Sequence, residues 1–266
     1  EESEQISQVY ELVEELIAPL GIGRRKLSDW GAEVVTVLST VYADQQLVRD
    51  DATDHYTLQA FRAVQASVVQ YRAAHAEITE VVGRTEARLN RRYFDEADLG
   101  NLLADIALDA TGADIALIHP GTIRKDMPKG DVEIADILDT NPFVDPIVVM
   151  DVSGAQLQAI MEQSFTLLRG LMQVSGLEVV YDTSKPERQR LVSLRHNGVP
   201  VRDDDRFEVA VPAIIAGGGD HYDEFLETRL LRESQPLGDL TVAYFRKHGV
   251  IPLPAAGRQR DIAAAQ

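Results

Sequence analysis

The stretch from Leu99 to Arg124 constrains the fold more than any other part of the chain. Its first half has apolar residues at the spacing of one helical face, namely Leu99, Leu102, Leu103, Ile106 and Ala110. Asp105 and Asp109 fall on the opposite side, which we expect to face solvent. Gly112 then stands where a helix often ends on a left-handed residue. The pattern therefore predicts a helix that ends just before Gly112.

The second half of this stretch predicts a strand followed by a tight turn. The apolar run from Ile115 to Ile118 is short and bounded by polar residues, as is typical of a buried strand. The chain then turns through His119, Pro120 and Gly121 and continues to Arg124. A strand that ends in a glycine turn, with an arginine just beyond it, is well suited to hold an anion.

The rest of the chain alternates predicted strands and helices. Ser153–Gln156 matches a capping box that opens a helix to about Leu168, and Asn197-Gly198 is typical of a type I′ hairpin turn. Ser234 and Pro236 are expected to begin a last amphipathic helix. Strands are predicted at Ile147–Val152, Leu177–Tyr181, Leu191–Arg195, Val199–Arg202 and Phe207–Val211. Hairpins mixed with helices favour an α+β fold with a mixed β-sheet and packed helices.

Residues 1–57 are predicted to form a helical extension in front of this fold. Apolar residues keep helical spacing from Ile6 to Leu20 and from Trp30 to Val41, and a linker helix is predicted from Thr57 to Ala76. We expect the first two helices to pack on the linker helix, or on its copy in a second subunit, because large apolar faces are rarely left exposed. The predicted division is an extension (1–57), a linker helix with the main domain (58–255) and a tail (256–266), frayed after Pro254.

The composition excludes several classes of protein. The net charge is −17, from 26 Lys and Arg against 43 Asp and Glu, whereas a nucleic-acid-binding protein needs positive charge. We therefore expect no nucleic acid partner, and an anionic small ligand would have to be bound by local arginines. The chain has no cysteine, which excludes disulfides and thiolate metal sites. It has no apolar run long enough to predict a membrane span.

Several short motifs follow one another in order between residues 75 and 250. They are Val82–Thr85, the Gly100-Asn101 helix with its Pro120–Arg124 turn, Asn141-Pro142-Phe143, Val152–Leu157, Gln173–Gly176 and Ala216–Asp220. In this order the motifs resemble the C-terminal domain of the bacterial and animal 5′-nucleotidases, the UDP-sugar hydrolase family. The resemblance implies the α+β fold of that domain.

The resemblance also implies roles for individual residues. Phe143 matches the phenylalanine that stacks on the ligand's base, and Arg124 matches the arginine that contacts the ligand's polar end. Asp220 matches the acid that binds ribose hydroxyls, and it follows Gly218 and Gly219, which suit close backbone approach or positive φ. Each side chain also has an ordinary structural interpretation. Phe143 would then be a core residue, Arg124 a member of an ion pair, and Asp220 a residue favoured in a loop.

Three positions depart from the family's pattern. Ile214 stands where the family has its second stacking phenylalanine, so one side of the aromatic clamp is lost. His119 stands at the asparagine that hydrogen-bonds the base, and Asp98 stands at an arginine that some members carry. We therefore expect a weakened site for a nucleoside or nucleotide. Its predicted residues are Arg124, Phe143, Asp220, His119, Ile214, Gly218 and Gly219.

Catalysis in this family also requires an N-terminal metallophosphatase domain that carries two metal ions. None of the six histidines of this chain has the His-x-His or Asp-x-His spacing of such sites. We therefore expect no cofactor in this chain, and divalent metals only in a separate catalytic domain. The resemblance implies a substrate-binding domain that works with a metallophosphatase domain or a second copy of itself, in the periplasm or outside the cell. The alternative is a non-catalytic binding or protein-interaction module that keeps the fold.

Overall fold

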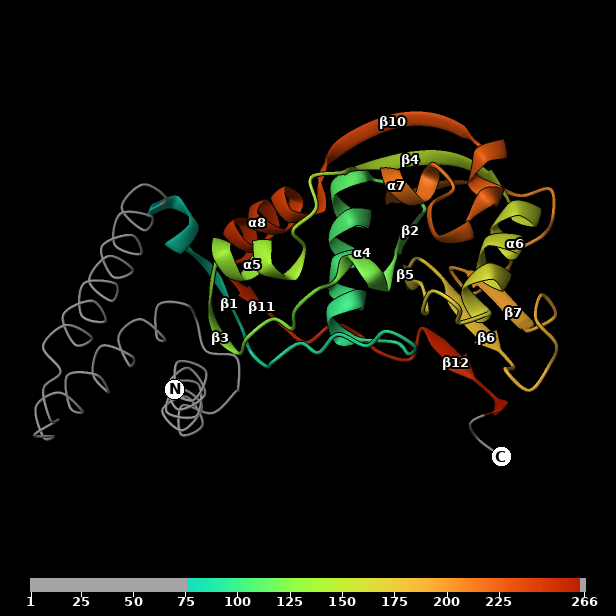
Figure 1. Ribbon diagram of the computed structural model, residues 1–266, viewed down its shortest axis with the longest axis horizontal. Coiled ribbons are helices and arrows are strands. Elements are labelled where there is room, and N and C mark those ends of the chain that lie inside the picture. Colours follow the sequence, from blue (N-terminus) through green and yellow to red (C-terminus); the bar gives the residue numbers. More distant parts are fainter. Residues whose placement is uncertain (1–75, 264–266) are drawn as a thin grey trace, which may run out of the picture. The chain divides into compact units, whose positions relative to one another are not determined.

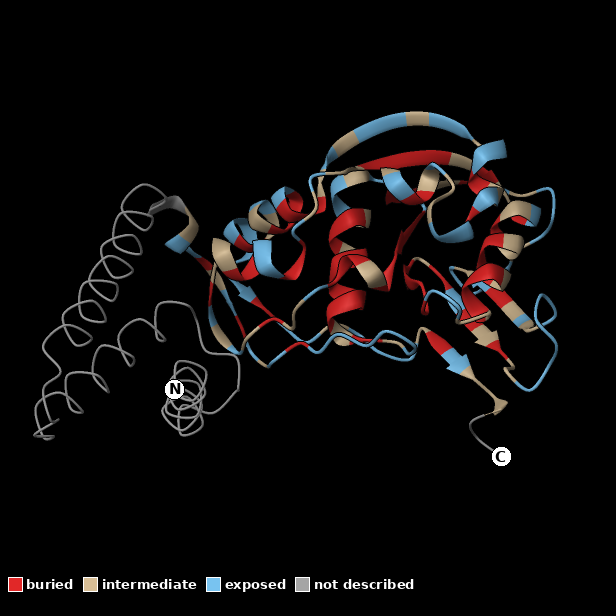
Figure 2. Ribbon diagram, in the orientation of Figure 1, coloured by how far each residue is buried: buried red, intermediate tan, exposed pale blue. Residues whose placement is uncertain are grey.

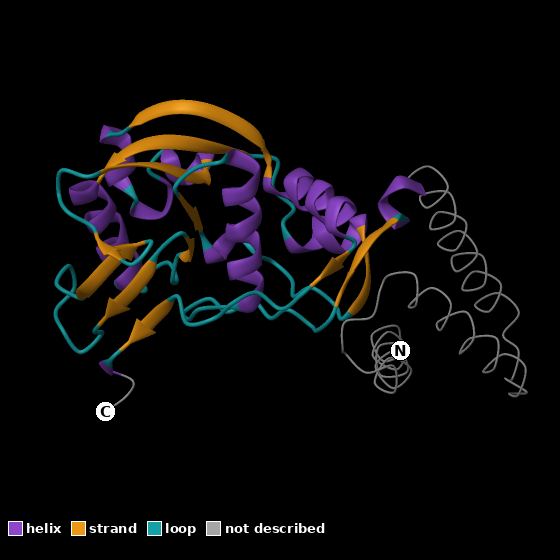
Figure 3. Cartoon of the chain, turned by 180° about the vertical axis from the view of Figure 1, so that it is seen from behind, coloured by secondary structure: helices purple, strands orange, loops and turns teal. Residues whose placement is uncertain are grey.

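A computed structural model describes residues 76–263, with three β-sheets and the helix α4 (Asp98–Thr111) near the middle of the unit (Figure 1). The predicted extension over residues 1–57, and all but the last residue of the predicted linker helix, lie outside the described residues. Figures 1 and 3 show, from opposite sides, that α6 (Gly154–Phe165) and α8 (Leu237–His248) lie at opposite ends of this unit. The predicted α+β class with mixed sheets is confirmed.

The largest sheet has five strands in the order β10-β4-β9-β2-β5. Its strands are β2 (Ile115–Ile118), β4 (Pro146–Ser153), β5 (Gln173–Ser175), β9 (Arg206–Pro212) and β10 (Arg229–Pro236). Strands β2 and β9 are parallel, whereas the other neighbours are antiparallel. Because side chains alternate across a strand, Ile115 and Leu117 enter one apolar core while Ala116 and Ile118 enter the other. The inner strands β2, β4 and β9 are therefore largely buried on both faces, whereas the edge strand β10 is mostly exposed (Figure 2).

Helices cover the two faces of the five-stranded sheet. The first core contains apolar residues of α6, and the second contains apolar residues of α4, α5 (Ile134–Thr140) and α8. Shorter helical elements are α7 (Ala213–Ala216), η2 (Ala76–Thr79), η3 (Pro120–Thr122), η4 (Gly219–His221) and η5 (Asp223–Glu227). Among the described residues, no helix has the length and apolar character needed to cross a lipid bilayer.

Two smaller sheets complete the unit, in the orders β11-β1-β3 and β12-β6-β7-β8. Their strands are β1 (Val81–Thr85), β3 (Gly130–Glu133), β6 (Glu178–Tyr181), β7 (Leu191–His196), β8 (Val199–Pro200), β11 (Val250–Ile251) and β12 (Gln259–Asp261). The pairs β1–β11 and β6–β12 are parallel and join segments that are far apart in the sequence. The mixed character of the fold therefore extends to all three sheets.

Three local signals of the sequence are confirmed by the structure. Gly112 ends α4 with φ of 64°, in the left-handed region. Ser153 accepts a hydrogen bond from the Gln156 backbone N–H, and the Gln156 side chain returns one to the Ser153 backbone. Asn197 and Gly198 have φ of 49° and 75°, as a type I′ turn requires.

Two predicted helix boundaries are wrong. The helix expected to reach Leu168 ends at Phe165, because Leu167 takes a left-handed conformation with φ of 58°. The last helix begins at Leu237 instead of Ser234, because the preceding residues form β10 as far as Pro236. Strand β10 pairs with β4 at the edge of the large sheet, a long-range pairing that local periodicity does not predict.

Two of the family motifs pack directly against each other. A Cβ on Gly100 would lie 2.3 Å from Oε1 of Gln173, so only glycine fits at this point of α4. The buried Gln173 side chain accepts a hydrogen bond from the Ala97 N–H and donates to the carbonyls of Asp95 and Leu171. Gly100 and Gln173 therefore fix the start of α4 against β5, which is a structural role.

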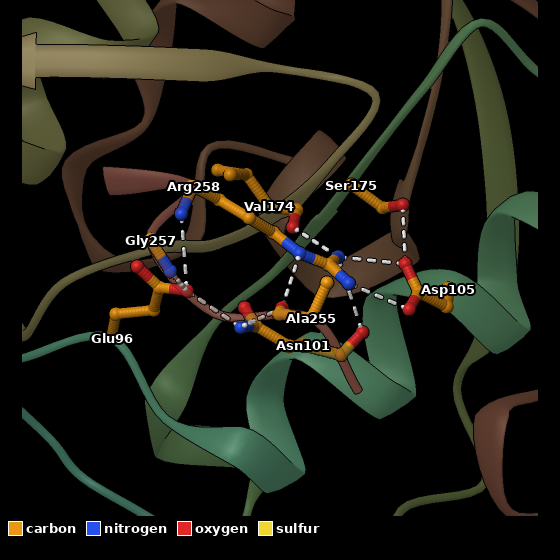
Figure 4. A network of polar contacts seen from close by, with 8 residues as sticks. All are labelled: Glu96, Asn101, Asp105, Val174, Ser175, Ala255, Gly257 and Arg258. Carbon is orange, nitrogen blue, oxygen red and sulfur yellow. Dashed lines mark hydrogen bonds and ion pairs between the residues drawn. The ribbon is translucent and has the colours of Figure 1, made fainter. Parts of the chain in front are cut away.

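Residues 255–263 are held against the rest of the domain, so the expectation of fraying directly after Pro254 is wrong. Figure 4 shows Arg258 reaching α4, where its guanidinium donates to both carboxylate oxygens of Asp105 at 2.6 and 2.7 Å. The Glu96 carboxylate accepts hydrogen bonds from the backbone N–H groups of Gly257, Arg258 and Gln259. Asp105, expected to face solvent, is instead a half-buried partner of the tail.

Candidate functional site

The first part of the candidate site is the turn that follows β2. His119 precedes η3, and its Nδ1 accepts a hydrogen bond from the Gly121 N–H at 3.1 Å. Its side chain is only 3% exposed. Because Nδ1 accepts, the hydrogen-bond network assigns the proton of the neutral ring to Nε2. A Cβ on Gly121 would lie 2.8 Å from His119 Nδ1, so this glycine lets the turn close over the ring.

The second part is the glycine-rich loop after α7. Gly218 has φ of 83° and Asp220 has φ of 54°, both in the left-handed region. A Cβ on Gly219 would lie 2.5 Å from the carbonyl oxygen of Ile214, so the loop can fold back on α7 only with glycine at this position. The glycines therefore have the roles that the sequence predicts for them, and they fix the position of the Asp220 carboxylate.

These two parts meet at Asp220. Its Oδ2 lies 3.7 Å from Nε2 of His119, and its Oδ1 lies 3.6 Å from Nε of Arg169. Arg169 was not predicted from the sequence. It lies two residues after the left-handed Leu167 and directly before Gly170, which has φ of 86° and packs against Pro120 and Tyr93. No local sequence motif predicts this turn. It places the Arg169 guanidinium beside the Asp220 carboxylate.

Burial sets the protonation of His119. Removal from water lowers the pKa of His119 from its ordinary value of 6.5, and the nearby charges of Arg169 and Arg124 lower it further. The Asp220 carboxylate and the Arg169 backbone oppose this shift without reversing it. The imidazole is therefore neutral at physiological pH and acts as an Nε2–H donor.

Lowering the pH through the range just below 6.5 is expected to remove stability that the neutral His119 provides. In that window the unfolded chain binds a proton at residue 119 and the folded chain does not, so the free energy of unfolding falls as the pH falls. We expect the stability difference between wild type and His119→Asn to shrink from about pH 7.5 to about pH 5.5. Urea titrations of both proteins across this pH range measure the stability difference. A difference that stays constant with pH contradicts this assignment.

The third part joins Arg124 and Phe143. The Arg124 guanidinium carbon lies 5.2 Å from the centroid of the Phe143 ring, a cation–π contact. The Arg124 backbone N–H donates to the Thr140 carbonyl at 2.8 Å, and the Asn141 side chain donates to the Thr122 carbonyl at 3.1 Å. These bonds hold the two predicted ligand-binding motifs together, with Arg124 exposed and Phe143 half-buried.

Ile214 and a small cavity lie at the margins of this arrangement. Ile214 is 55% exposed on α7, and its carbonyl packs on Gly219. A cavity of about 190 Å³ is lined by Pro120 and Ile123 of the His119 turn and by Arg91, Arg92 and Tyr93. This cavity was not predicted from the sequence, although two arginines followed by two aromatic residues at positions 91–94 are a visible signal. Among residues 76–263, no three His, Asp or Glu side chains group in a way that could hold a metal ion.

Comparison with known proteins assigns the family. The family model described as the 5′-nucleotidase C-terminal domain matches residues 73–227. The chain belongs to the 5′-nucleotidase family. The resemblance stated from the sequence motifs is thus confirmed, and so is the assignment to the C-terminal domain.

Individual members of the 5′-nucleotidase family extend this result. A 5′-nucleotidase-related protein of Glossina morsitans morsitans is 31% identical over 67% of this chain and 37% of its own length. An apyrase of Anopheles gambiae is 31% identical over 65% of this chain and 33% of its own. The crystal structure of a 5′-nucleotidase precursor from Thermus thermophilus superposes with a TM-score of 0.68 at 27% identity, over 76% of this chain and 43% of that one. The chain therefore spans less than half of each of these relatives.

Proposed function

We propose that this chain is the nucleoside- or nucleotide-binding domain of a 5′-nucleotidase-type phosphohydrolase. The observation that carries the proposal is the arrangement of Phe143, Arg124, His119 and Asp220 around the turn after β2. An aromatic face and a carboxylate held by glycine-rich loops are what a base and a sugar hydroxyl require. The metal-dependent hydrolysis belongs, in this proposal, to a separate metallophosphatase domain.

Positive groups near the site favour a ligand with an anionic end. We call the His119 turn (residues 119–124) and the glycine-rich loop (residues 217–220) the two binding loops. Arg124 lies in the first, Arg169 lies beside Asp220 of the second, and Arg91 and Arg92 line the neighbouring cavity. Local arginines can bind a phosphate even though the whole chain carries a net charge of −17. We therefore propose that the phosphate end of a nucleotide lies on the side of the His119 turn where these arginines gather.

The site also has features that weaken binding and keep the second candidate function open. Ile214 offers no aromatic face, and the Arg124 guanidinium lies over the Phe143 ring, where a base would otherwise stack. A non-catalytic module that retains the fold would have such a reduced site. For the substrate-binding domain we expect dissociation constants on the order of 0.1–10 mM without the catalytic domain.

Adenosine and AMP are expected to bind the full chain and to shift NMR signals of the two binding loops. Phe143→Leu removes the stacking face but keeps apolar bulk, and should weaken binding about 3- to 10-fold. Asp220→Asn removes the carboxylate but still suits the left-handed conformation (φ of 54°), and should weaken binding about 10-fold or more. Titrations followed by NMR give the dissociation constants of the wild type and the two variants for each ligand.

Asp204→Asn is the matched control for this experiment. Asp204 is exposed in the β8–β9 turn, so the substitution makes the same change in net charge outside the two binding loops. Its dissociation constants should equal those of the wild type. If neither ligand produces saturable shifts in the wild type, the substrate-binding proposal is wrong and the non-catalytic module is favoured.

We also propose that the protein acts outside the cytoplasm, in the periplasm or the extracellular space. The family resemblance supports this location, because its members are usually exported. The absence of cysteine is compatible with it, since stability in an oxidising compartment then depends on no disulfide. Fractionation of cells that express the native gene tests this proposal.

A further inference from the structure

The Arg124 guanidinium has no acidic partner in the part of the chain that the structure describes. Lys125, the next residue, forms an ion pair with Asp139 at 2.6 Å, whereas no carboxylate of the described residues lies within ion-pair distance of Arg124. The guanidinium carbon lies instead over the Phe143 ring, 5.2 Å from its centroid. Because Arg124 is exposed, its unneutralised charge is accessible to an anionic group of a ligand.

The same contact covers the aromatic ring on which a base would stack. Phe143 is half-buried, so part of its surface already packs against the domain, and the guanidinium lies over the ring. Stacking requires direct contact between the two rings, so a base can use this face only after the guanidinium has left it. We call the arrangement with Arg124 over Phe143 the covered state.

The backbone around both residues is fixed, so the covered state can open by rotation of one side chain. The Arg124 N–H donates to the Thr140 carbonyl at 2.8 Å, and the Asn141 side chain donates to the Thr122 carbonyl at 3.1 Å. Rotation about the side-chain bonds of the exposed Arg124 leaves these hydrogen bonds intact. Such rotations take place within nanoseconds, so the ring can be uncovered without any change of fold.

An anion binds a guanidinium more strongly than an aromatic ring does. An exposed cation–π contact favours the covered state by about 2- to 5-fold. A charge-assisted hydrogen bond from arginine to an anionic oxygen changes an equilibrium by about 10- to 100-fold. A ligand with a phosphate therefore supplies the interaction that opens the covered state, whereas a neutral nucleoside has to displace the guanidinium without compensation.

We propose that Arg124 covers the Phe143 ring in the unliganded protein and that an anionic group draws it away, so that the site selects nucleotides over nucleosides. This inference rests on the proposed nucleotide-binding function and adds a coupling between the two ends of the ligand. The coupling is reciprocal: an anion bound at Arg124 strengthens binding of a base at Phe143 by the same factor as the base strengthens binding of the anion. The contact is thus autoinhibitory towards neutral ligands.

The test compares adenosine with AMP on the full chain. Wild type is expected to bind AMP about 10-fold more tightly than adenosine. Arg124→Ala removes the charge and uncovers the ring, so adenosine should bind about 2- to 5-fold more tightly than it binds wild type, while AMP loses affinity. Arg124→Lys keeps a cation and should retain part of the preference for AMP.

Arg260→Ala is the matched control for Arg124→Ala. Arg260 is exposed on β12, so the substitution removes the same charge outside the two binding loops. Both affinities should equal those of the wild type. A gain in adenosine affinity that is confined to the Arg124 variant separates uncovering of the ring from a general change in net charge.

A measurement on the wild type covers the case in which a variant does not fold. Inorganic phosphate, compared with sodium chloride at the same ionic strength, should strengthen adenosine binding by about 2- to 5-fold, because it holds Arg124 away from the ring. The same addition should have no such effect on Arg124→Ala. Without any nucleoside, phosphate should also move the Arg124 Nε–H resonance, which the Phe143 ring current shifts in the covered state.

The outcomes separate this inference from the proposed function. An adenosine affinity that is unchanged or lower in folded Arg124→Ala overturns the inference while nucleoside binding stands, because the guanidinium would then not obstruct the base. Adenosine binding to wild type that phosphate weakens or leaves unchanged has the same consequence. If neither adenosine nor AMP binds to the wild type, the proposed function fails together with the inference.

Discussion

Replacing Arg258 by methionine is expected to lower the free energy of unfolding by about 2–3 kcal/mol, or the melting temperature by roughly 5–10 °C. The Arg258 side chain is 15% exposed and forms two hydrogen bonds with the Asp105 carboxylate, at 2.6 and 2.7 Å. It also donates to the Val174 carbonyl at 3.0 Å. Methionine preserves much of the apolar stem but leaves the Asp105 carboxylate, among the described residues, with the Ser175 hydroxyl as its remaining hydrogen-bond donor.

The magnitude follows from the burial of the pair. Loss of one partner from a fully buried ion pair costs about 3–5 kcal/mol, and the 35% exposure of the Asp105 side chain reduces that cost. Arg260→Met is the matched control, because Arg260 is exposed on the same strand, β12. Urea denaturation of both variants measures the difference. Equal stability of the Arg258 and Arg260 variants would show that the tail is not held by this pair.

The tail also shows what the sequence could not predict. Residues Pro252–Ala256 have no strand pattern, and β12 has only three residues, so local periodicity favours a frayed end. The order comes from partners far away in the chain, since Arg258 and Asp105 are 153 residues apart and β12 pairs with β6. A single sequence contains no signal for such pairings.

The accurate predictions depend on short-range chemistry. The Ser153–Gln156 capping box, the Asn197-Gly198 turn and the left-handed Gly112 each involve residues within a few positions of one another. Their hydrogen bonds and backbone angles follow from the residue types alone. This is why the helix cap, the hairpin turn and the end of α4 were predicted correctly, while the end of α6 depended on the unexpected left-handed Leu167 and the residues before α8 formed β10.

The candidate site, too, could be predicted from the sequence only in part. The motifs named Phe143, Arg124 and Asp220, and the structure places Phe143 beside Arg124 and Asp220 beside His119. Arg169 could not be named, because its position beside Asp220 depends on the conformation of the turn after α6. The orientation of the His119 ring could not be predicted from the sequence either, because it depends on the hydrogen bond from the Gly121 N–H to Nδ1.

Substitution of Gly154 by alanine is expected to destabilise the fold by about 3 kcal/mol or more. Gly154 is the first residue of α6, and a Cβ there would lie 1.8 Å from the Arg202 carbonyl oxygen. The neighbouring backbone cannot move away easily, because the Gly154 N–H donates to the Asp205 carbonyl at 2.8 Å. The glycine of this family motif therefore has a packing role, and its loss should separate α6 from the loop before β9.

Gly238→Ala is the matched control for this prediction. Gly238 lies in the first turn of α8 and is also buried, but a Cβ there would meet its nearest atom, the Asn141 carbonyl oxygen, only at 3.4 Å. Because alanine favours a helix over glycine by up to about 1 kcal/mol, Gly238→Ala should leave stability unchanged or raise it slightly. Thermal and urea unfolding of the two variants give the comparison. A Gly154→Ala protein as stable as Gly238→Ala would mean that α6 can shift against residues 202–205, and that the glycine is not required by packing.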